Sequence, residues 1–408
     1  MKASCDHEIA YRCLLASSFL MAFSLPAGRA MLAVCFIVTL WDLIKHKKRP
    51  FVPPVVWLGF AFLALTAVVT VFGVNPSLGV PKLTKLLWFM GIPLAAILVT
   101  SSARLSGVLG AYAVGAGVLA AQTCLFNPIH ARMHAQSGLM PDFRTALIDL
   151  GSMTDGQRLM LAVVVSLGFL IVAVRTKREW RWWGVLLALH AAALALNFKR
   201  GSWFCAFGLV VILVGAGARR RYVLLVLLLG AATLAFPSVR ARLGALASEF
   251  REGQGGRMTM WTRIAPVLIR EHPWGIGYRS LTNEMMRKIE PRVEPNRDHL
   301  HSNVFQVLVE SGWLGLFLYL MWMGWSMADA AVHLRRSSGL SPPERVTALI
   351  LLLMLAGLLA NGIVEYNLGD AEIVLLYGLV MGSAAAGRRR CQGQAAGELV
   401  LSWKEQLC

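Results

Sequence analysis

The stretch Val346–Val364 reads VTALILLLMLAGLLANGIV and contains no charged residue. A helix needs about 20 mainly apolar residues to cross the hydrocarbon core of a membrane. Similar stretches recur along the 408 residues of the chain, of which 57% are hydrophobic and only 15% charged. The mean hydropathy is +0.60. A water-soluble protein could not bury so much apolar surface, so the composition predicts an integral membrane protein.

Twelve such segments are predicted to span the membrane, which makes the chain an all-α polytopic membrane protein. They are Ile9–Phe23, Arg29–Ile44, Val55–Phe72, Lys82–Thr100, Leu105–Phe126, Arg158–Val174, Trp182–Phe198, Ser202–Gly217, Tyr222–Phe236, His301–Met327, Val346–Val364 and Asp370–Ala386. The first segment has the length of a signal peptide. It leads through Pro26 and Arg29 into the second without a small-residue cleavage site, so we expect a retained span.

The basic residues of the short connections set the orientation. With twelve spans, five clusters fall on one side, at residues 45–49, 175–178, 219–221, 335–336 and 388–390. Positive charge is retained in the cytoplasm, so both termini are predicted to be cytoplasmic. The net charge of +18, which in a soluble protein would suggest nucleic acid, is then mainly a topology signal. We expect no nucleic-acid partner.

Two long segments then lie on the extracytoplasmic side, residues 127–157 and 237–300. The predicted organisation is nine spans in residues 1–236, a large loop in 237–300, three spans in 301–386 and a cytoplasmic tail in 387–408. The large loop is expected to be partly helical. Met258–Ile269 has Trp261, Ile264 and Leu268 along one helical face, and a turn follows at residues 273–278.

Basic residues also gather on the extracytoplasmic side. The large loop holds eleven basic and seven acidic residues, a net charge of +4, and Lys199 and Arg200 interrupt an apolar stretch. Three more cations begin spans on this side: Lys82, Lys85 and Arg158. Arginine forks match phosphate oxygens, which favours an anionic ligand. The alternatives are ion pairs with the loop acids, contacts with lipid headgroups, and snorkelling of lysines to the interface.

His301 opens the tenth predicted span. At a helix N-terminus the macrodipole disfavours imidazolium and keeps a neutral base available. Asp298, or a neighbouring Asn or Ser, is expected to cap this helix, and Gly312 and Gly315 are expected to let another helix approach. A structural role for the histidine is the alternative.

These residues together resemble the O-antigen ligase family, within a superfamily that includes O-antigen polymerases and protein O-oligosaccharyltransferases. His301-Ser302, followed after nine residues by Gly312-x-x-Gly315, looks like the H-[SN]-x9-G-x-x-G pattern. Arg200 in Lys-Arg-Gly-Ser-Trp looks like the arginine of S/T-R-G-x-W, with Lys199 as a departure. Arg257 in Gly-Gly-Arg-Met-Thr-Met-Trp looks like the arginine of G-x-R-x-x-x-W.

The resemblance implies a C-type glycosyltransferase-like fold in a bacterial inner membrane, with the active site facing the periplasm. It implies inverting transfer of a glycan from undecaprenyl diphosphate to a sugar hydroxyl of lipid A–core. His301 would be the base, and Arg200 and Arg257 would stabilise the diphosphate leaving group. Weaker candidates for binding the lipid diphosphate are Arg263, Lys199, Lys82, Lys85 and Arg158.

No metal or other cofactor is expected. The seven cysteines form no C-x-x-C pair, and the outer side has no D-x-D motif or nucleotide-binding glycine loop. The partners would be the lipid-linked glycan donor, the lipid A–core acceptor and membrane lipids. Glu365, Asp370 and Glu372, at the outer ends of the last two spans, either orient His301 or an arginine or pair with loop cations.

Several rival functions fit parts of the sequence. An O-antigen polymerase would use the same donor with a second lipid-linked glycan as acceptor, and a protein O-oligosaccharyltransferase would glycosylate Ser or Thr. A lipid-linked glycan transporter could also use twelve spans and basic residues, but the sequence has no repeated halves. A structural interaction protein would leave His301 and Arg200 unexplained.

Overall fold

The computed structural model describes residues 5–50, 52–217, 221–233, 256–293, 298–339 and 341–406, with isolated positions at 235, 239–240 and 244. Within these ranges every regular element is a helix and no strand occurs, which confirms the all-α prediction. The elements are α1 (Cys5–Leu20), α2 (Leu25–Lys45), α3 (Pro54–Val71), α4 (Pro76–Gly79), η1 (Val80–Met90), α5 (Gly91–Leu98), α6 (Ser102–Gln136), α7 (Phe143–Leu150), α8 (Met153–Arg175), α9 (Arg181–Leu196), α10 (Arg200–Gly217), α11 (Arg221–Thr233), α14 (Arg257–Thr259), η2 (Met260–Ile264), α15 (Ala265–Glu271), α16 (Asn283–Ile289), α17 (Asn303–Arg336), η3 (Ser337–Gly339), α18 (Pro342–Val364) and α19 (Ala371–Gln406).

Within the described residues, eight helical segments are long and apolar enough to cross a membrane: α2, α3, Pro76–Leu98, α6, α8, α17, α18 and the first part of α19. Three shorter apolar helices occur at Arg181–Leu196, Arg200–Ala216 and Tyr222–Ala231. Each of the twelve predicted segments overlaps a helix, although the end of the ninth lies outside the described residues. The chain is therefore an integral membrane protein, and the count of twelve crossings stays a prediction.

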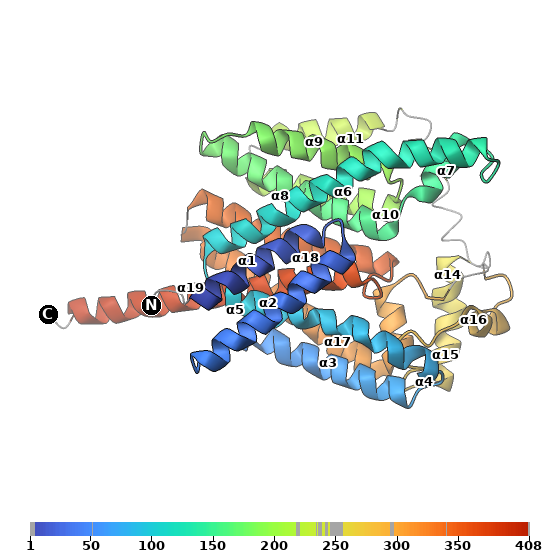
Figure 1. Cartoon of the computed structure of the whole chain (residues 1–408), viewed down its shortest axis with the longest axis horizontal. Coiled ribbons are helices and arrows are strands. Elements are labelled where there is room, and N and C mark those ends of the chain that lie inside the picture. The colour runs from blue at the N-terminus through green and yellow to red at the C-terminus, as the bar shows by residue number, and fades with distance from the viewer. Residues whose placement is uncertain are drawn as a thin grey trace.

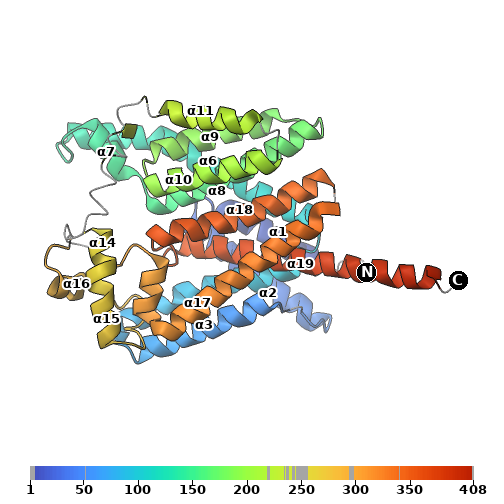
Figure 2. The ribbon, with the colours of Figure 1, turned by 180° about the vertical axis from the view of Figure 1, so that it is seen from behind.

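The helices form an elongated bundle. The small helices α14, α15 and α16 lie at one end, and α1 begins and α19 ends at the other (Figure 1). Helices α6, α8, α9, α10 and α11 pack together along one side, and α18 joins them to α17 and α19 (Figure 2). This arrangement agrees with termini on the side opposite to the large loop. Which end faces the cytoplasm stays a prediction.

The predicted span Lys82–Thr100 is not one α-helix. It is divided into the 3₁₀ helix η1 and α5, and the short α4 lies just before it. Pro81 and Pro93 lack the backbone N–H that a continuous α-helix needs. A 3₁₀ helix of 11 residues is unusually long and places every third side chain on one face.

The first long extracytoplasmic segment, residues 127–157, is also more regular than expected. Helix α6 continues through Pro128 to Gln136, and α7 and the start of α8 occupy most of the remainder. The expected long loop is thus short here, because the helix extends beyond its most apolar part.

Helix α17 is kinked at Gly312, whose φ of 67° and ψ of −171° are not helical. The large loop packs into this kink: the N–H groups of Ile276 and Gly277 donate to the carbonyls of Val309 and Glu310, each at 2.9 Å. A Cβ at Gly312 would lie 2.5 Å from the Pro273 carbonyl oxygen. Gly312 therefore admits the backbone of the loop, not another helix as the sequence suggested.

The large loop has a small core of its own. Ile264 and Leu268 are buried there and Trp261 packs against it, which confirms the predicted helical face, although the helix contains a π-helical turn at Met260–Ile264. The turn predicted at residues 273–278 is present, with Trp274 exposed. This core gives the loop a defined shape against the start of α17.

Candidate functional site

His301 lies just before α17, in a left-handed backbone conformation with φ of 49°. Such a conformation is uncommon for a residue with a side chain and is maintained only by its surroundings. The side chain is buried, and its Nδ1 lies 3.4 Å from Oε2 of Glu365. An ionised carboxylate only accepts, so this contact assigns the ring proton to Nδ1 and leaves Nε2 as the acceptor of the ring.

Glu365 joins His301 to Arg257. It follows the last residue of α18 and is buried, and its Oε1 forms an ion pair with Nη2 of Arg257, the first residue of α14. One carboxylate therefore contacts both the base candidate and an arginine candidate. Of the two roles left open for Glu365 in the sequence, orienting His301 and pairing with a loop cation, the structure places it to serve both.

The tryptophan of the Arg257 motif fixes this helix against the His301 segment. Trp261 donates from Nε1 to the Leu300 carbonyl at 2.8 Å, and its ring stacks on Phe305 with centroids 5.3 Å apart. Arg257 lies four residues earlier, about one helical turn away. The spacing of the motif thus places the arginine beside Glu365 while the tryptophan contacts the residue before His301.

Burial is the largest influence on the pKa of His301 and lowers it below its ordinary 6.5. The hydrogen bond to Glu365 acts in the opposite direction, while nearby His299 and Arg257 lower the pKa further. The predicted neutral base is therefore supported, with burial as its main cause. The prediction of a side-chain cap was wrong: Ser302 is the N-cap residue without a capping hydrogen bond, and Asp298 contacts Nδ1 of His299 at 2.7 Å.

A second buried carboxylate supports the His301 segment from within α17. Glu310 accepts from the Arg279 backbone N–H at 2.7 Å, from Gln306 Nε2 at 2.8 Å and from the Tyr366 hydroxyl at 3.1 Å. Gln306 in turn accepts from the Leu300 N–H at 2.7 Å. This network links the kink of α17 to the backbone immediately before His301.

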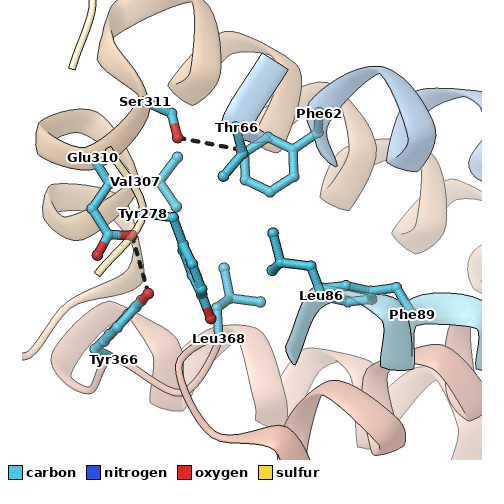
Figure 3. Close-up of a pocket in the computed structure, with 10 residues that line it drawn as sticks. All are labelled: Phe62, Thr66, Leu86, Phe89, Tyr278, Val307, Glu310, Ser311, Tyr366 and Leu368. Atoms are coloured by element: carbon cyan, nitrogen blue, oxygen red, sulfur yellow. Dashed lines mark hydrogen bonds between the residues drawn. The ribbon is translucent and has the colours of Figure 1, made fainter. Parts of the chain in front are cut away.

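Figure 3 shows Glu310 and Tyr366 at one side of a small cavity, with the ring of Tyr278 between them and Leu86. The cavity has a volume of about 10 Å³, room for about one water molecule. The buried Tyr278 hydroxyl has no hydrogen-bond partner among the described residues. The cavity is too small for a sugar, so it is not a substrate-binding pocket.

Arg200 begins α10 beside the outer end of α18. A Cβ at the next residue, Gly201, would lie 3.4 Å from Nδ2 of Asn361 and 3.9 Å from Cγ2 of Val364, which precedes Glu365. Trp203 of the same motif lies on α10 and donates from Nε1 to the Leu194 carbonyl of α9 at 2.7 Å. This hydrogen bond holds the start of α10 against the end of α9. The structure therefore places Arg200 next to the segment that carries Glu365.

The weaker candidates are dispersed. Arg263 contacts Glu290 at 3.4 Å, and the Lys199 side chain lies over the turn that begins α8. Arg158 is buried, pairs with Asp155 and donates to carbonyls of the α1–α2 turn. These contacts provide a structural role for Arg158, and its binding of a phosphate stays a prediction.

Lys82 and Lys85 lie on η1, and Lys82 donates from Nζ to the Arg279 carbonyl at 3.3 Å. Sequence reasoning treated Arg279 only as part of the loop charge and did not single out Glu310, Gln306 or Tyr366. An acid inside an apolar span such as Glu310 is itself a functional signal. Gln306 lies four residues earlier on the same helix, whereas Arg279 and Tyr366 come from the loop and from the α18–α19 connection and are revealed as partners only by the fold.

One group of possible metal ligands occurs in the described part of the chain, formed by Asp6, Asp42 and His46. It lies at the start of α1 and the end of α2, at the opposite end of the bundle from α14 to α16 (Figure 1). Lys48 donates to both carboxylate oxygens of Asp42, and Lys45 donates to Asp6. These acids are already paired with lysines and are remote from His301.

Residues 185–320 match a family model described as O-antigen ligase. The matched segment contains Arg200, Arg257 and His301, whereas Glu365 lies beyond it. Comparison with curated proteins finds no match. The family match confirms the resemblance that the three motifs indicated.

Proposed function

Residues 185–320 carry the domain of the O-antigen ligase family, and from this premise we propose that the protein is an O-antigen ligase. It transfers O-antigen glycan from undecaprenyl diphosphate to a sugar hydroxyl of lipid A–core, on the periplasmic side of the bacterial inner membrane. The family also covers polymerases and oligosaccharyltransferases. The observation that carries the proposal is the contact of Glu365 with both His301 and Arg257.

In the proposed reaction, the hydroxyl oxygen of the acceptor attacks the anomeric carbon of the donor glycan. Nε2 of His301 accepts the hydroxyl proton, and Glu365 orients the ring through Nδ1 and stabilises the imidazolium that forms. The bond from the anomeric carbon to the diphosphate oxygen breaks, and its electron pair leaves with the diphosphate. Direct displacement inverts the anomeric centre.

Arg257 and Arg200 stabilise the leaving diphosphate. Negative charge on the diphosphate increases as the bond breaks, and fixed cations stabilise the transition state most where charge develops. Arg257 is oriented by Glu365, and Arg200 begins a helix at the adjacent outer end of α18. No step requires a metal, and Arg263 and Lys199 stay weaker candidates for binding the donor diphosphate.

A transfer assay with purified protein tests this proposal. The protein is incubated with undecaprenyl diphosphate-linked glycan and lipid A–core, with chelator and without nucleotide. We expect glycan on the core lipid, and a loss of about 10²–10⁴-fold in rate with His301→Ala. Arg287→Ala, at an exposed position of α16, is the control for Arg257→Ala and should leave the rate unchanged.

The products also decide among the rival functions. Longer glycans on the lipid carrier would indicate a polymerase, and glycan on a protein acceptor an oligosaccharyltransferase. Transport of the lipid-linked glycan without any transfer would contradict an enzymatic role.

A further inference from the structure

A second group of cations lies around η1 and comes from other elements than Arg200 and Arg257. Lys82 and Lys85 are three residues apart and share a face of this 3₁₀ helix with Trp88. The guanidinium of Arg29, from the start of α2, lies over the Trp88 ring at 5.0 Å. Lys82 donates to the carbonyl of Arg279 in the large loop. Three elements distant in sequence thus bring four cations together.

The charges of this group are compensated only in part: Arg279 donates from Nη2 to the Gly369 carbonyl and interacts electrostatically with Glu310 and Asp370. In the described part of the chain, the half-buried Lys85 has no hydrogen-bond or ion-pair partner, and the buried Nε atoms of Arg29 and Arg279 also have none. The carboxylate that acts on Lys85 is Asp370, which accepts a hydrogen bond from Thr154 at 2.8 Å. Cations held near a membrane without partners are costly, which indicates a site for an anion.

This group of cations is connected to His301 through other residues than Arg257 is. Arg257 contacts Glu365, which contacts His301. Arg279 instead lies over the Tyr366 ring at 5.5 Å, and Tyr366 lies 5.9 Å from the His299 ring. The rings of His299 and His301 are 4.2 Å apart. In a reaction between two lipid substrates, both substrates must be held close to the same base, and two separate groups of cations could hold them.

The other faces of η1 offer a place for a hydrocarbon chain. Leu83, Leu87 and Met90 line an apolar groove of about 520 Å³ between η1, α5 and α3, with Trp322 of α17 at its wall. This volume lies within the roughly 300–1,000 Å³ of ligand pockets. One short helix therefore borders both a cationic group and an apolar groove, the two environments that a phosphorylated lipid requires.

We propose that Arg29, Lys82, Lys85 and Arg279 bind a phosphate group of the acceptor, an acylated and phosphorylated glycolipid, with an acyl chain in the groove along η1. Charge complementarity and the adjacent groove identify this class of ligand. The inference rests on the proposed transfer reaction, because it assigns the second of that reaction's two lipids to this face. The donor diphosphate remains with Arg200 and Arg257.

Kinetics with the full chain in lipid nanodiscs test the site through the double variant Arg29→Gln/Lys85→Gln. Lys85 has no polar partner to lose, so the fold should tolerate its substitution. We expect the KM for the phosphorylated acceptor to rise about tenfold or more, with the donor KM and kcat within about twofold of the wild type. Lys288→Gln, an exposed change of the same charge on α16, should leave both KM values unchanged.

Enzymatically dephosphorylated acceptor and inorganic phosphate complete the test. The wild type should show a raised KM for the dephosphorylated acceptor, and the double variant should show no further increase with it. Inorganic phosphate should inhibit only at concentrations far above the acceptor KM, because it lacks the acyl chain. An unchanged acceptor KM in the variant, a raised donor KM, or inhibition by free phosphate as effective as by lipid would overturn the inference. Absence of transfer by the wild type would instead refute the proposed function.

Discussion

Nδ1 of His301 lies 3.4 Å from Oε2 of Glu365, although 64 positions separate the two residues in the chain. The contact joins the segment before α17 to the end of α18. It orients the ring so that Nε2 is its acceptor, which is the tautomer that a general base requires. Because Glu365 also pairs with Arg257, the protonation of the base and the position of the arginine are coupled through one carboxylate.

The first prediction concerns pH. Burial lowers the pKa of His301 below 6.5, and the neutral ring is the active form. The rate constant kcat/KM should therefore rise as pH increases through that pKa and stay level near neutrality. Glu365 favours the imidazolium, so Glu365→Gln should lower the pKa further and move the acid limb to lower pH. The plateau should fall about 10²-fold or more, because the ring loses its orienting carboxylate.

Initial rates measured between about pH 4.5 and 8, a range roughly centred on the ordinary histidine pKa, distinguish Glu365→Gln from the wild type. Glu372→Gln, at the start of α19, serves as the control, because within the described residues Glu372 makes no hydrogen bond or ion pair with His301 or Arg257. An acid limb in Glu365→Gln that coincides with that of the wild type would exclude a role for Glu365 in the titration of His301.

The second prediction separates charge from geometry at Arg257. Arg257→Lys keeps a cation but loses the planar fork that pairs with Glu365 and matches diphosphate oxygens. We expect a fall in kcat of about 10-fold or more for the lysine variant and about 10²–10³-fold for Arg257→Gln, measured at saturating donor. Equal rates in Arg257→Lys and the wild type would show that a point charge suffices.

The sequence predicted the helices well because each predicted segment is a long apolar run, and length and hydropathy are properties of single segments. Lys82–Thr100 is the instructive case, because it lies in a segment long and apolar enough to cross a membrane, as predicted, but is not one α-helix. Its first part is a 3₁₀ helix that packs against α19, and Pro81 near the start of that helix and Pro93 within α5 lack a backbone N–H. The 3₁₀ geometry determines which face of the helix carries the lysines. It cannot be predicted from the number of apolar residues in the segment.

The site was predicted in part. His301, Arg200 and Arg257 were singled out because they belong to short motifs with fixed spacing, and their roles stay predictions. The role of Glu365 remained one of two alternatives, because its partners lie 64 and 108 positions away in the chain. The glycine of the motif was found but misread: the sequence indicated close packing of helices, whereas Gly312 kinks α17 and accommodates the loop.

The third prediction tests this kink. Gly312→Ala places a Cβ 2.5 Å from the Pro273 carbonyl oxygen and within 3 Å of the Trp274 backbone, at a φ that disfavours a side chain. We expect a loss of stability of about 1–3 kcal/mol, together with a lower rate, because the loop is displaced from α17. Thermal unfolding and the transfer assay measure the two effects.

Gly324→Ala is the matched control, because a Cβ there meets no atom within 4 Å and the same helix is regular at that position. It should be neutral or slightly stabilising, since alanine favours a helix over glycine by about 1 kcal/mol. If both alanine variants behaved alike, the contact of the loop with the kink would have no energetic importance.

The fourth prediction concerns Trp261, which fixes the helix of Arg257 against the backbone before His301. Trp261→Phe retains a ring to stack on Phe305 but removes the hydrogen bond to the Leu300 carbonyl. The lost bond should cost about 1–3 kcal/mol, because that carbonyl is left without its donor. The rate should fall more than the stability does, since both the base and the arginine lose their common support. Trp274→Phe, an exposed change on the same loop, should alter neither the unfolding temperature nor the rate. A normal rate in Trp261→Phe would mean that Glu365 alone is sufficient to align His301 with Arg257.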